Sequence, residues 1–435
     1  MKKIAVFLLT LSMLLSIMPV GAMATAQWDG LIKSGDFTQE EFDAWTKTTV
    51  YRDENSVTGY MVSFRYYAPE AARVRVAGEW AFSDVHHASL AKVDALLPDQ
   101  WYPGCFPSLG SSTPLDMTLN AETGYWSCTI PLPSGIFNYQ FWIGGEADDN
   151  TGAEITADPQ NRPIEMAEGN EKMSQVFMPF DPDRQIDDYS NQGPRTDGQA
   201  GEVSFVNYYS SVFEAECPLG VYLPYGYDAE RDEPYKVLYL AHGGGSIESF
   251  WMSQLAAPNI ADNLIAQGII EPTIIVTPNL REPGTTGYAQ DVERNIERVL
   301  TDIIPFIEAN YNVSTAAEDR ALAGLSMGSM FTWNTFYRQP LQFGYFGTWS
   351  SGVAGNMTDE NELIATYDLS SDDYKVPTFV TGCGTFASDA LPTYAMQKML
   401  THYGIEYTSC YVNGAHRCHV WSVQLEDFMK RVLWK

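Results

Sequence analysis

Basic residues are scarce in this chain. Its 435 residues include 26 lysines and arginines against 55 aspartates and glutamates, which gives a formal net charge of −29. Such an acidic protein repels nucleic-acid phosphates and anionic lipid, so we expect neither nucleic acid nor a membrane among its partners. The charge fits an exported protein that acts on neutral or weakly charged material.

Cysteines with metal-binding spacing are also missing. None of the six cysteines stands in a C-x-x-C pattern, so we expect no metal and no other cofactor. Export would permit disulfides, and Cys105 with Cys128 is then the candidate local pair. The alternative is that several cysteines are buried free thiols, which behave as small apolar residues.

Long apolar runs are missing except at the start of the chain. Residues 1–3 are a short basic segment, residues 4–20 are almost entirely apolar, and Ala22-Met23-Ala24 matches the pattern cut by signal peptidase. We therefore expect residues 1–24 to be a signal peptide and the protein to be secreted. A membrane anchor is the weaker alternative, because the run is short and no later stretch approaches the roughly 18 apolar residues of a spanning helix.

The first half of the mature chain has a β-type pattern. Alternating apolar and polar residues predict strands at 60–67, 72–78, 124–130 and 137–143, separated by proline and glycine. We expect an antiparallel β-sandwich over residues 25–180. A polar segment rich in Asp, Gln, Gly and Pro follows at 181–202 and is typical of a linker.

Residues 203–435 instead alternate strands with helices. Apolar runs predict strands at 236–241, 273–277, 320–324 and 378–381, and helical spacing is present at 256–267 and 291–311. Repeated units of this kind predict a parallel sheet with helices on both faces, which is an α/β fold.

The strongest chemical motif is Gly324-Leu325-Ser326-Met327-Gly328, which matches G-x-S-x-G. It follows a predicted strand and opens a predicted helix, the setting in which an α/β-hydrolase presents its nucleophile on a tight turn. We therefore predict an α/β-hydrolase catalytic domain with Ser326 as the catalytic nucleophile.

A serine hydroxyl needs a base, and in this fold the base comes last along the chain. His416 follows a strand-like segment and the turn Asn413-Gly414-Ala415, so it is our predicted catalytic base. His419 is the alternative, and His402 lies at the end of a predicted helix.

The segment Ala241-His242-Gly243-Gly244-Gly245 ends the first strong strand of this domain. Three glycines there favour a close approach of backbone N–H groups to a developing oxyanion. We predict an oxyanion hole formed by the N–H groups of Gly244 and Met327. The alternative is a flexible turn.

Residues 203–435 resemble carbohydrate esterase family 1, the feruloyl and acetylxylan esterases, and the related enterochelin esterases. The resemblance rests on residues 221–227, 237–245, 262–265 and 323–328, and on His416 followed by Val420-Trp421. Residues 60–159 resemble the immunoglobulin-like module that precedes many such esterases and is related to family 48 carbohydrate-binding modules. The resemblance implies hydrolysis of an acyl ester on a plant cell-wall polysaccharide or another acyl conjugate.

One departure from the family concerns the acid of the triad. The family places an aspartate after the strand that corresponds to 378–381, and the directly matching residue here is Ala387. Asp389, two residues later, is our predicted catalytic acid. The alternatives are that Asp389 caps the next helix, or that the chain is a degenerate, non-catalytic carbohydrate-binding relative.

Aromatic residues supply candidate substrate contacts. Trp251 and Trp421, and also Tyr288, are candidates for the walls of a substrate site, although each is equally a candidate core residue. We expect a secreted serine esterase that removes feruloyl or acetyl groups from hemicellulose such as xylan. An esterase for a siderophore is the alternative within the enzymes, and export disfavours it.

Overall fold

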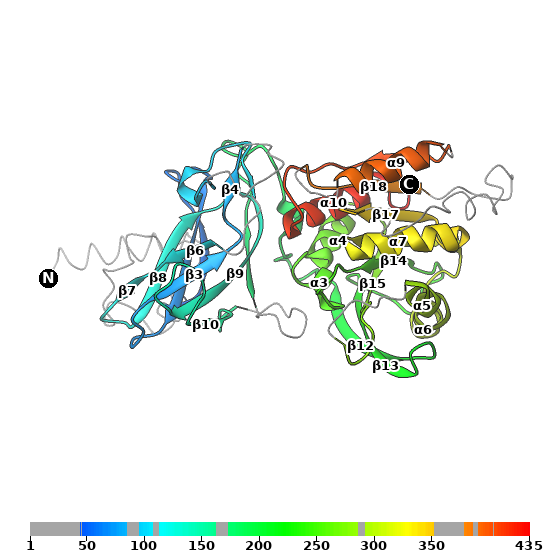
Figure 1. Cartoon of the computed structure of the whole chain (residues 1–435), viewed down its shortest axis with the longest axis horizontal. Coiled ribbons are helices and arrows are strands. Elements are labelled where there is room, and N and C mark those ends of the chain that lie inside the picture. The colour runs from blue at the N-terminus through cyan, green and yellow to red at the C-terminus, as the bar shows by residue number, and fades with distance from the viewer. Residues whose placement is uncertain are drawn as a thin grey trace. The chain divides into compact units, whose positions relative to one another are not determined.

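The computed structural model describes residues 44, 46–84, 95–107, 113–161, 173–285, 292–351, 378–385, 390–402 and 404–435 (Figure 1). Chain contacts divide the described residues into an N-terminal unit that ends at Ser190 and a C-terminal unit that spans Asn191–Lys435. The predicted signal peptide and Tyr288 lie outside the described residues. No helix in the described part is long and apolar enough to cross a bilayer.

The described residues of the N-terminal unit form two larger antiparallel sheets and one short strand pair. One has the strand order β1-β2-β8-β7 and comprises β1 (Thr49–Arg52), β2 (Tyr60–Tyr67), β7 (Thr118–Asn120) and β8 (Tyr125–Pro131). The other has the order β10-β9-β3-β6, with β11 also paired to β9, and comprises β3 (Val74–Gly78), β6 (Thr113–Asp116), β9 (Gly135–Gly144), β10 (Ala153–Thr156) and β11 (Ser174–Met178). β4 (Phe82–Ser83) pairs with β5 (Phe106–Pro107). All four predicted strands are present, as β2, β3, β8 and β9.

One apolar core joins these two sheets. The Phe64 ring of β2 lies 5.3 Å from that of Trp80 and 4.7 Å from that of Tyr139 on β9. The tryptophans of this unit that the structure describes are buried, with at most 8% of their surface exposed in Trp80, Trp101, Trp126 and Trp142. Packing therefore accounts for these rings.

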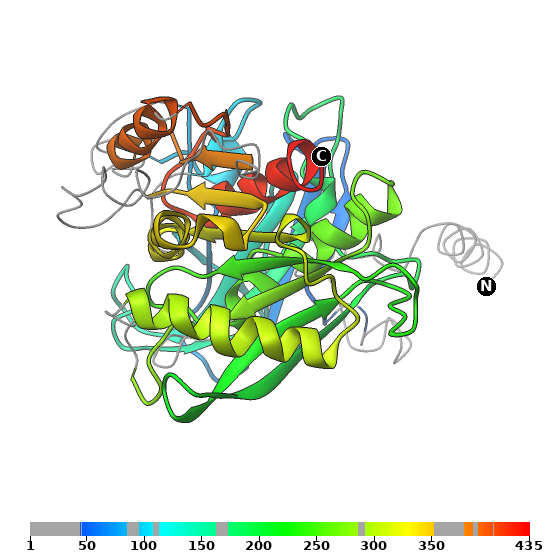
Figure 2. The same cartoon turned by 90° about the vertical axis from the view of Figure 1, so that its right-hand side faces the viewer.

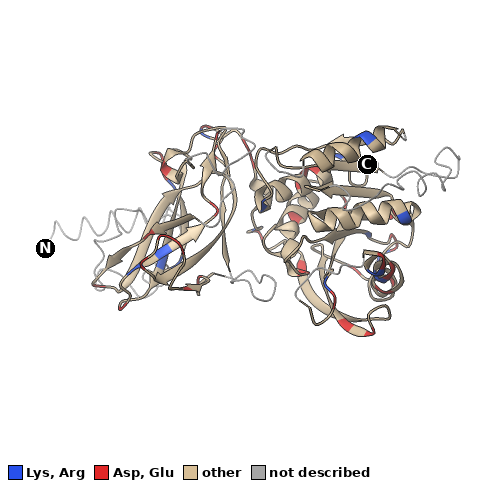
Figure 3. Ribbon diagram, viewed as in Figure 1, with Lys and Arg blue, Asp and Glu red and all other residues tan. Residues whose placement is uncertain are grey.

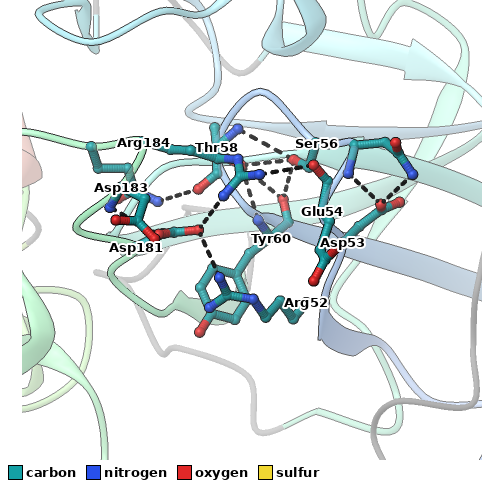
Figure 4. Close-up of polar contacts among 11 residues, drawn as sticks. Arg52, Asp53, Glu54, Ser56, Thr58, Tyr60, Asp181, Asp183 and Arg184 are labelled. Carbon is teal, nitrogen blue, oxygen red and sulfur yellow. Dashed lines mark hydrogen bonds and ion pairs between the residues drawn. The ribbon is translucent and has the colours of Figure 1, made fainter.

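The segment 181–202, predicted as a linker, begins inside the N-terminal unit. The Asp181 carboxylate is fully buried, accepts a hydrogen bond from Nη1 of Arg184 at 3.1 Å and lies 3.5 Å from Nη2 of Arg52 (Figure 4). It packs so closely on Gly59 (φ +85°) that a Cβ there would lie 2.0 Å from Oδ2 of Asp181. The buried Asp181 carboxylate and its two partly exposed arginine partners tie the first residues of the segment to the N-terminal unit.

Later residues of the same segment bind the C-terminal unit. Asn191 donates from Nδ2 to Oε1 of Glu426 at 2.7 Å, and Nδ2 of Asn263 donates to the Asn191 carbonyl at 3.0 Å. The predicted linker is thus divided between the two units.

Within the described residues, the C-terminal unit has an eight-stranded sheet of order β12-β13-β15-β14-β16-β17-β18-β19. Its strands are β12 (Glu202–Ser210), β13 (Ala215–Leu223), β14 (Lys236–Ala241), β15 (Thr273–Pro278), β16 (Arg320–Leu325), β17 (Tyr345–Trp349), β18 (Thr378–Gly382) and β19 (Tyr407–Ser409). The strands from β15 to β19 in this order are parallel, as predicted, while β12 and β13 form an antiparallel hairpin on one edge.

Helices cover both faces of this sheet (Figure 2). α3 (Ser249–Met252), α4 (Ala257–Ala266) and α10 (Cys418–Arg431) pack on one face. α5 (Val292–Arg298), α6 (Ile304–Asn310), α7 (Met327–Arg338) and α9 (Ala390–His402) pack on the other. Short 3₁₀ turns are present at Pro98–Gln100, Ser190–Gln192, Ala317–Asp319 and Pro340–Gln342.

The helix predicted at 291–311 contains a π-helical turn. α5 and α6 are joined by the π-helical segment η6 (Val299–Ile303), and Pro305 is the second residue of α6. Proline has no N–H to donate to the carbonyl four residues earlier, and its ring crowds that carbonyl. A wider turn ahead of Pro305 relieves both effects without ending the helix.

Candidate active site

Ser326 stands at the turn between strand β16 and helix α7. Its backbone has φ 53° and ψ −119°, a region that residues with a Cβ rarely adopt. Such strain persists only where the surroundings enforce it, and it is typical of functional positions. The turn presents the half-buried Ser326 side chain at the carboxyl edge of the parallel strands.

Both glycines of the motif are required by close backbone packing. A Cβ on Gly324 would lie 2.4 Å from the carbonyl oxygen of Gly328. A Cβ on Gly328 would lie 2.4 Å from the carbonyl oxygen of Ala241 and 2.6 Å from that of His242. The sequence motif therefore reflects the tight crossing of α7 over the end of β14.

His416 is the histidine that reaches Ser326. Its Nε2 lies 2.9 Å from Oγ of Ser326, which is hydrogen-bond distance. His416 is exposed and lies in the turn just before α10. The edge of its ring meets Trp421 of α10 at 4.8 Å and 90°.

The other two late histidines lie elsewhere. His402 is an exposed residue at the end of α9, as predicted. His419, the alternative base, is half-buried in the first turn of α10, and desolvation lowers its pKa to about 4. A group with that pKa is a poor proton acceptor near neutral pH.

Asp389, the predicted acid, lies outside the described residues, and so does Ala387. Its role stays a prediction. Two acidic residues of α10 have partners of their own: Glu426 binds Asn191 and Lys430, and Asp427 binds Arg431.

The glycine-rich loop after β14 passes directly over the Ser326 turn. A Cβ on Gly243 would lie 2.7 Å from Cδ1 of Leu325 and 3.3 Å from Cβ of Ser326. A Cβ on Gly244 would lie 2.6 Å from Sδ of Met327. The structure therefore packs Gly244 against the Met327 side chain next to the Ser326 turn, and the role of their N–H groups as an oxyanion hole stays a prediction.

His242 fixes the start of this loop. The backbone N–H of Leu280 donates to Nε2 of His242 at 2.9 Å, so the proton is on Nδ1, which donates to the Gly243 carbonyl at 2.8 Å. Burial lowers the pKa of His242 to about 4, and the ring is neutral at pH 7. His242 thus ties the loop after β14 to the segment after β15.

Arg281 is a residue that the sequence did not single out. Its buried guanidinium donates from Nε to the Ser246 carbonyl and from Nη2 to the Gly245 carbonyl, both at 3.0 Å. Two parallel donors hold the outer part of the glycine loop rigidly. No local sequence pattern predicts these two hydrogen bonds, because they join residues that are 35 and 36 positions apart.

The two tryptophans predicted as substrate contacts, Trp251 and Trp421, lie in different surroundings. Trp251 is fully buried, donates from Nε1 to the Ala241 carbonyl at 3.0 Å and packs on Trp349, which favours the alternative that it is a core residue. Trp421 is 7% exposed and packs against the ring of His416. This contact suits a residue that orients the ring of His416, the predicted base.

The cysteines form no disulfide. None of the six is in a disulfide, including Cys105 and Cys128, which corrects the proposed pairing in favour of buried or half-buried cysteines. Burial raises the pKa of Cys105.

Comparison with known families gives a match over most of the C-terminal unit. The esterase family model described as "Putative esterase" matches residues 210–432, just over half of the chain. The chain belongs to this esterase family. The Ser326–His416 pair and the glycine-rich loop all lie within the matched region.

Among curated proteins, this esterase is similar to the endo-1,4-beta-xylanase/feruloyl esterase of Xylanibacter ruminicola. The two are 40% identical over 167 residues, which are 37% of this chain and 23% of that protein. The chain thus matches less than a quarter of that relative's length.

Solved structures show the fold. A ferulic acid esterase from Anaeromyces mucronatus superposes with a TM-score of 0.50 at 24% identity, covering 56% of this chain and 95% of that one. The enterochelin esterase of Shigella flexneri superposes with a TM-score of 0.57 at 15% identity, covering 92% and 98%. The C-terminal unit therefore has the α/β-hydrolase fold of esterases, as predicted.

Proposed function

We propose that this protein is a serine esterase that hydrolyses feruloyl or acetyl esters on plant hemicellulose such as xylan. The observation that carries the proposal is the 2.9 Å contact between Oγ of Ser326 and Nε2 of His416 on a strained strand-to-helix turn. An esterase family member with this geometry has the two groups that nucleophilic ester cleavage needs.

The proposed reaction begins with proton transfer from Ser326 to His416 as the hydroxyl oxygen attacks the ester carbonyl. A tetrahedral intermediate forms, and its oxyanion accepts hydrogen bonds from the N–H groups of Gly244 and Met327. Each such donor lowers the barrier by about 3–4 kcal/mol. His416 then returns the proton to the leaving alcohol, and water attacks the acyl-enzyme by the same route in reverse.

The substrate class rests on two observations. The relative with 40% identity is described as both an endo-xylanase and a feruloyl esterase. Acidic residues outnumber basic ones by 55 to 26, and charged residues of both signs are distributed over both units (Figure 3), which favours a neutral polysaccharide over an anionic one. The likeness to enterochelin esterase covers more of the chain, but at 15% identity it concerns the fold alone.

We further propose that Asp389 completes the triad, that residues 1–24 direct export, and that the N-terminal unit is an immunoglobulin-like β-sandwich with a packing or positioning role. Its two antiparallel sheets around one aromatic core support the last point.

The proposed function is tested with purified protein and insoluble arabinoxylan. We expect release of ferulate or acetate by the wild type and none by Ser326→Ala. Release of neither acid by the folded wild type, under conditions where a control esterase acts, overturns the proposed substrate class.

A further inference from the structure

His416 lies in a tight turn of the backbone. The N–H of Arg417 donates to the Ala415 carbonyl at 2.9 Å, so His416 is the central residue of a three-residue turn. Ala415 is fully buried, which packs the turn against the protein interior although His416 itself is exposed. The 2.9 Å contact between Nε2 of His416 and Oγ of Ser326 therefore depends on where this turn lies.

Gly384, the second residue after β18, packs directly against this turn. A Cβ on Gly384 would lie 2.6 Å from the carbonyl oxygen of Gly414 and 2.7 Å from that of Ala415. Both are backbone atoms, and the second is the acceptor that closes the turn around His416. The φ of Gly384 lies outside the left-handed region, so lack of space, and not backbone conformation, requires glycine here.

Hydrogen bonds fix Gly384 against the segment that leads to the turn. The N–H of Val412 donates to the Cys383 carbonyl at 3.2 Å, and the N–H of Thr385 donates to the Val412 carbonyl at 2.9 Å. Cys383, Gly384 and Val412 are buried. Carbon–oxygen contacts normally begin at about 3.3 Å, so a Cβ on Gly384 would displace the carbonyls of the turn by roughly 0.6–0.7 Å.

A displacement of this size is large compared with the tolerance of the catalytic contact. Along the line from Nε2 of His416 to Oγ of Ser326 it would lengthen the separation from 2.9 Å to about 3.5 Å, which is beyond the normal hydrogen-bond range. A misplacement of about 1 Å in a catalytic group can cost about a hundredfold in rate.

We propose that Gly384 is a positioning residue for the base: the missing side chain lets the turn around His416 lie where Nε2 reaches Ser326. This inference rests on the proposed serine-esterase mechanism and adds to it a residue that sets the distance between nucleophile and base. Gly384 acts through His416, so its role needs no contact with the substrate.

The test compares two glycine-to-alanine variants of the full chain with 4-nitrophenyl acetate, an ester without a sugar. Gly384→Ala is expected to lower kcat about 10- to 100-fold and to leave KM within about twofold. Gly344→Ala is the matched control. A Cβ on Gly344 would lie 2.8 Å from Cα of Glu318, which is also a backbone clash, but Gly344 precedes β17, whose other end holds the Ser326 N–H.

Gly344→Ala should lower the free energy of unfolding in urea and leave kcat unchanged. Wild-type kcat in Gly384→Ala overturns the inference. The same loss of kcat in both variants also overturns it, because the effect is then one of general packing.

A second variant guards against misfolding of Gly384→Ala. Thr385→Pro removes the N–H that donates to Val412 and adds no atom at Gly384, whose strand-like pairing with Val412 tolerates a following proline. We expect kcat to fall at least about threefold at an unchanged KM. Thr385→Ala keeps the N–H and should match the wild type. Wild-type kcat in Thr385→Pro contradicts the proposal.

Crystal structures of the wild type and Gly384→Ala separate this inference from the proposed function. If the wild type hydrolyses no ester, the proposed function fails, and the distance between Nε2 of His416 and Oγ of Ser326 still tests the role of Gly384. We expect about 3.5 Å or more in the variant against 2.9 Å in the wild type. An unchanged distance overturns the inference.

Discussion

The ring of Trp421 meets the imidazole of His416 edge-on, at 4.8 Å and 90°. Trp421 is nearly buried on α10, so it forms a fixed wall against which the exposed His416 ring is oriented. A base that is free to turn spends less time with Nε2 toward Ser326, and small misplacements are costly in catalysis.

Replacing this wall should therefore slow the chemical step. We expect Trp421→Ala to lower kcat for 4-nitrophenyl acetate by about 10- to 100-fold with little change in KM. Trp421→Phe keeps an aromatic edge and should retain most of the activity. Equal activity of the Ala variant and the wild type, with both folded by circular dichroism, would show that Trp421 does not orient the base.

Arg281 should act on the same step through the glycine loop. Removing its two hydrogen bonds to the Gly245 and Ser246 carbonyls frees the loop that carries the predicted oxyanion donor Gly244. We expect Arg281→Met to lower kcat at least about tenfold for methyl ferulate and 4-nitrophenyl acetate alike. Arg281→Lys, which offers no planar pair of donors, should recover only part of the loss. A pure KM effect would contradict this role.

The buried His242 predicts a pH dependence of stability. Its pKa is about 4 in the folded protein and about 6.5 when unfolded, so between these values the unfolded state binds the extra proton. Its contribution is complete above pH 6.5 and is lost as the pH falls toward 4. Urea unfolding at pH 7, 5.5 and 4.5 should show a smaller loss of stability in His242→Gln than in the wild type. His402→Gln, at an exposed position, is the control. If the free energy of unfolding changes equally with pH in all three proteins, the lowered pKa of His242 is refuted.

The sequence alone predicted the parts of the fold that local pattern determines. β14 was predicted at its observed bounds, 236–241, because a strand buried on both faces appears as a continuous apolar run. The hairpin of β12 and β13 was missed, because β12 lies on the sheet edge and mixes exposed with buried residues. The Ser326 turn was predicted because the spacing of Gly324 and Gly328 around Ser326 is a local pattern.

Long-range contacts were not visible in the sequence. Trp251 was a candidate substrate contact because of its aromatic ring. Its ring packs on Trp349, which is almost a hundred positions away in the sequence. Arg281 gains its role only when the loop after β14 folds against the segment after β15. Charged residues give no local signal that separates such contacts from a solvated surface.

The acid of the triad gives a further prediction. A carboxylate on Nδ1 of the base holds it in the productive tautomer, and loss of that carboxylate is severe in serine hydrolases. We expect Asp389→Asn to lower kcat by at least about a hundredfold. Glu426→Gln is the control, since Glu426 already binds Asn191 and Lys430. Wild-type activity in Asp389→Asn would mean that another group, or none, orients His416.

The most direct measurement of the central claim is covalent trapping of the nucleophile. The protein is treated with diethyl 4-nitrophenyl phosphate, and the intact mass, the modified peptide and the remaining esterase activity are measured together. We predict one diethylphosphoryl group per chain, located on Ser326, with activity lost in proportion, slower labelling in His416→Ala, and no labelling or turnover in Ser326→Ala. Labelling at another residue that accompanies the loss of activity, or ester hydrolysis by folded Ser326→Ala, would contradict the Ser326–His416 mechanism.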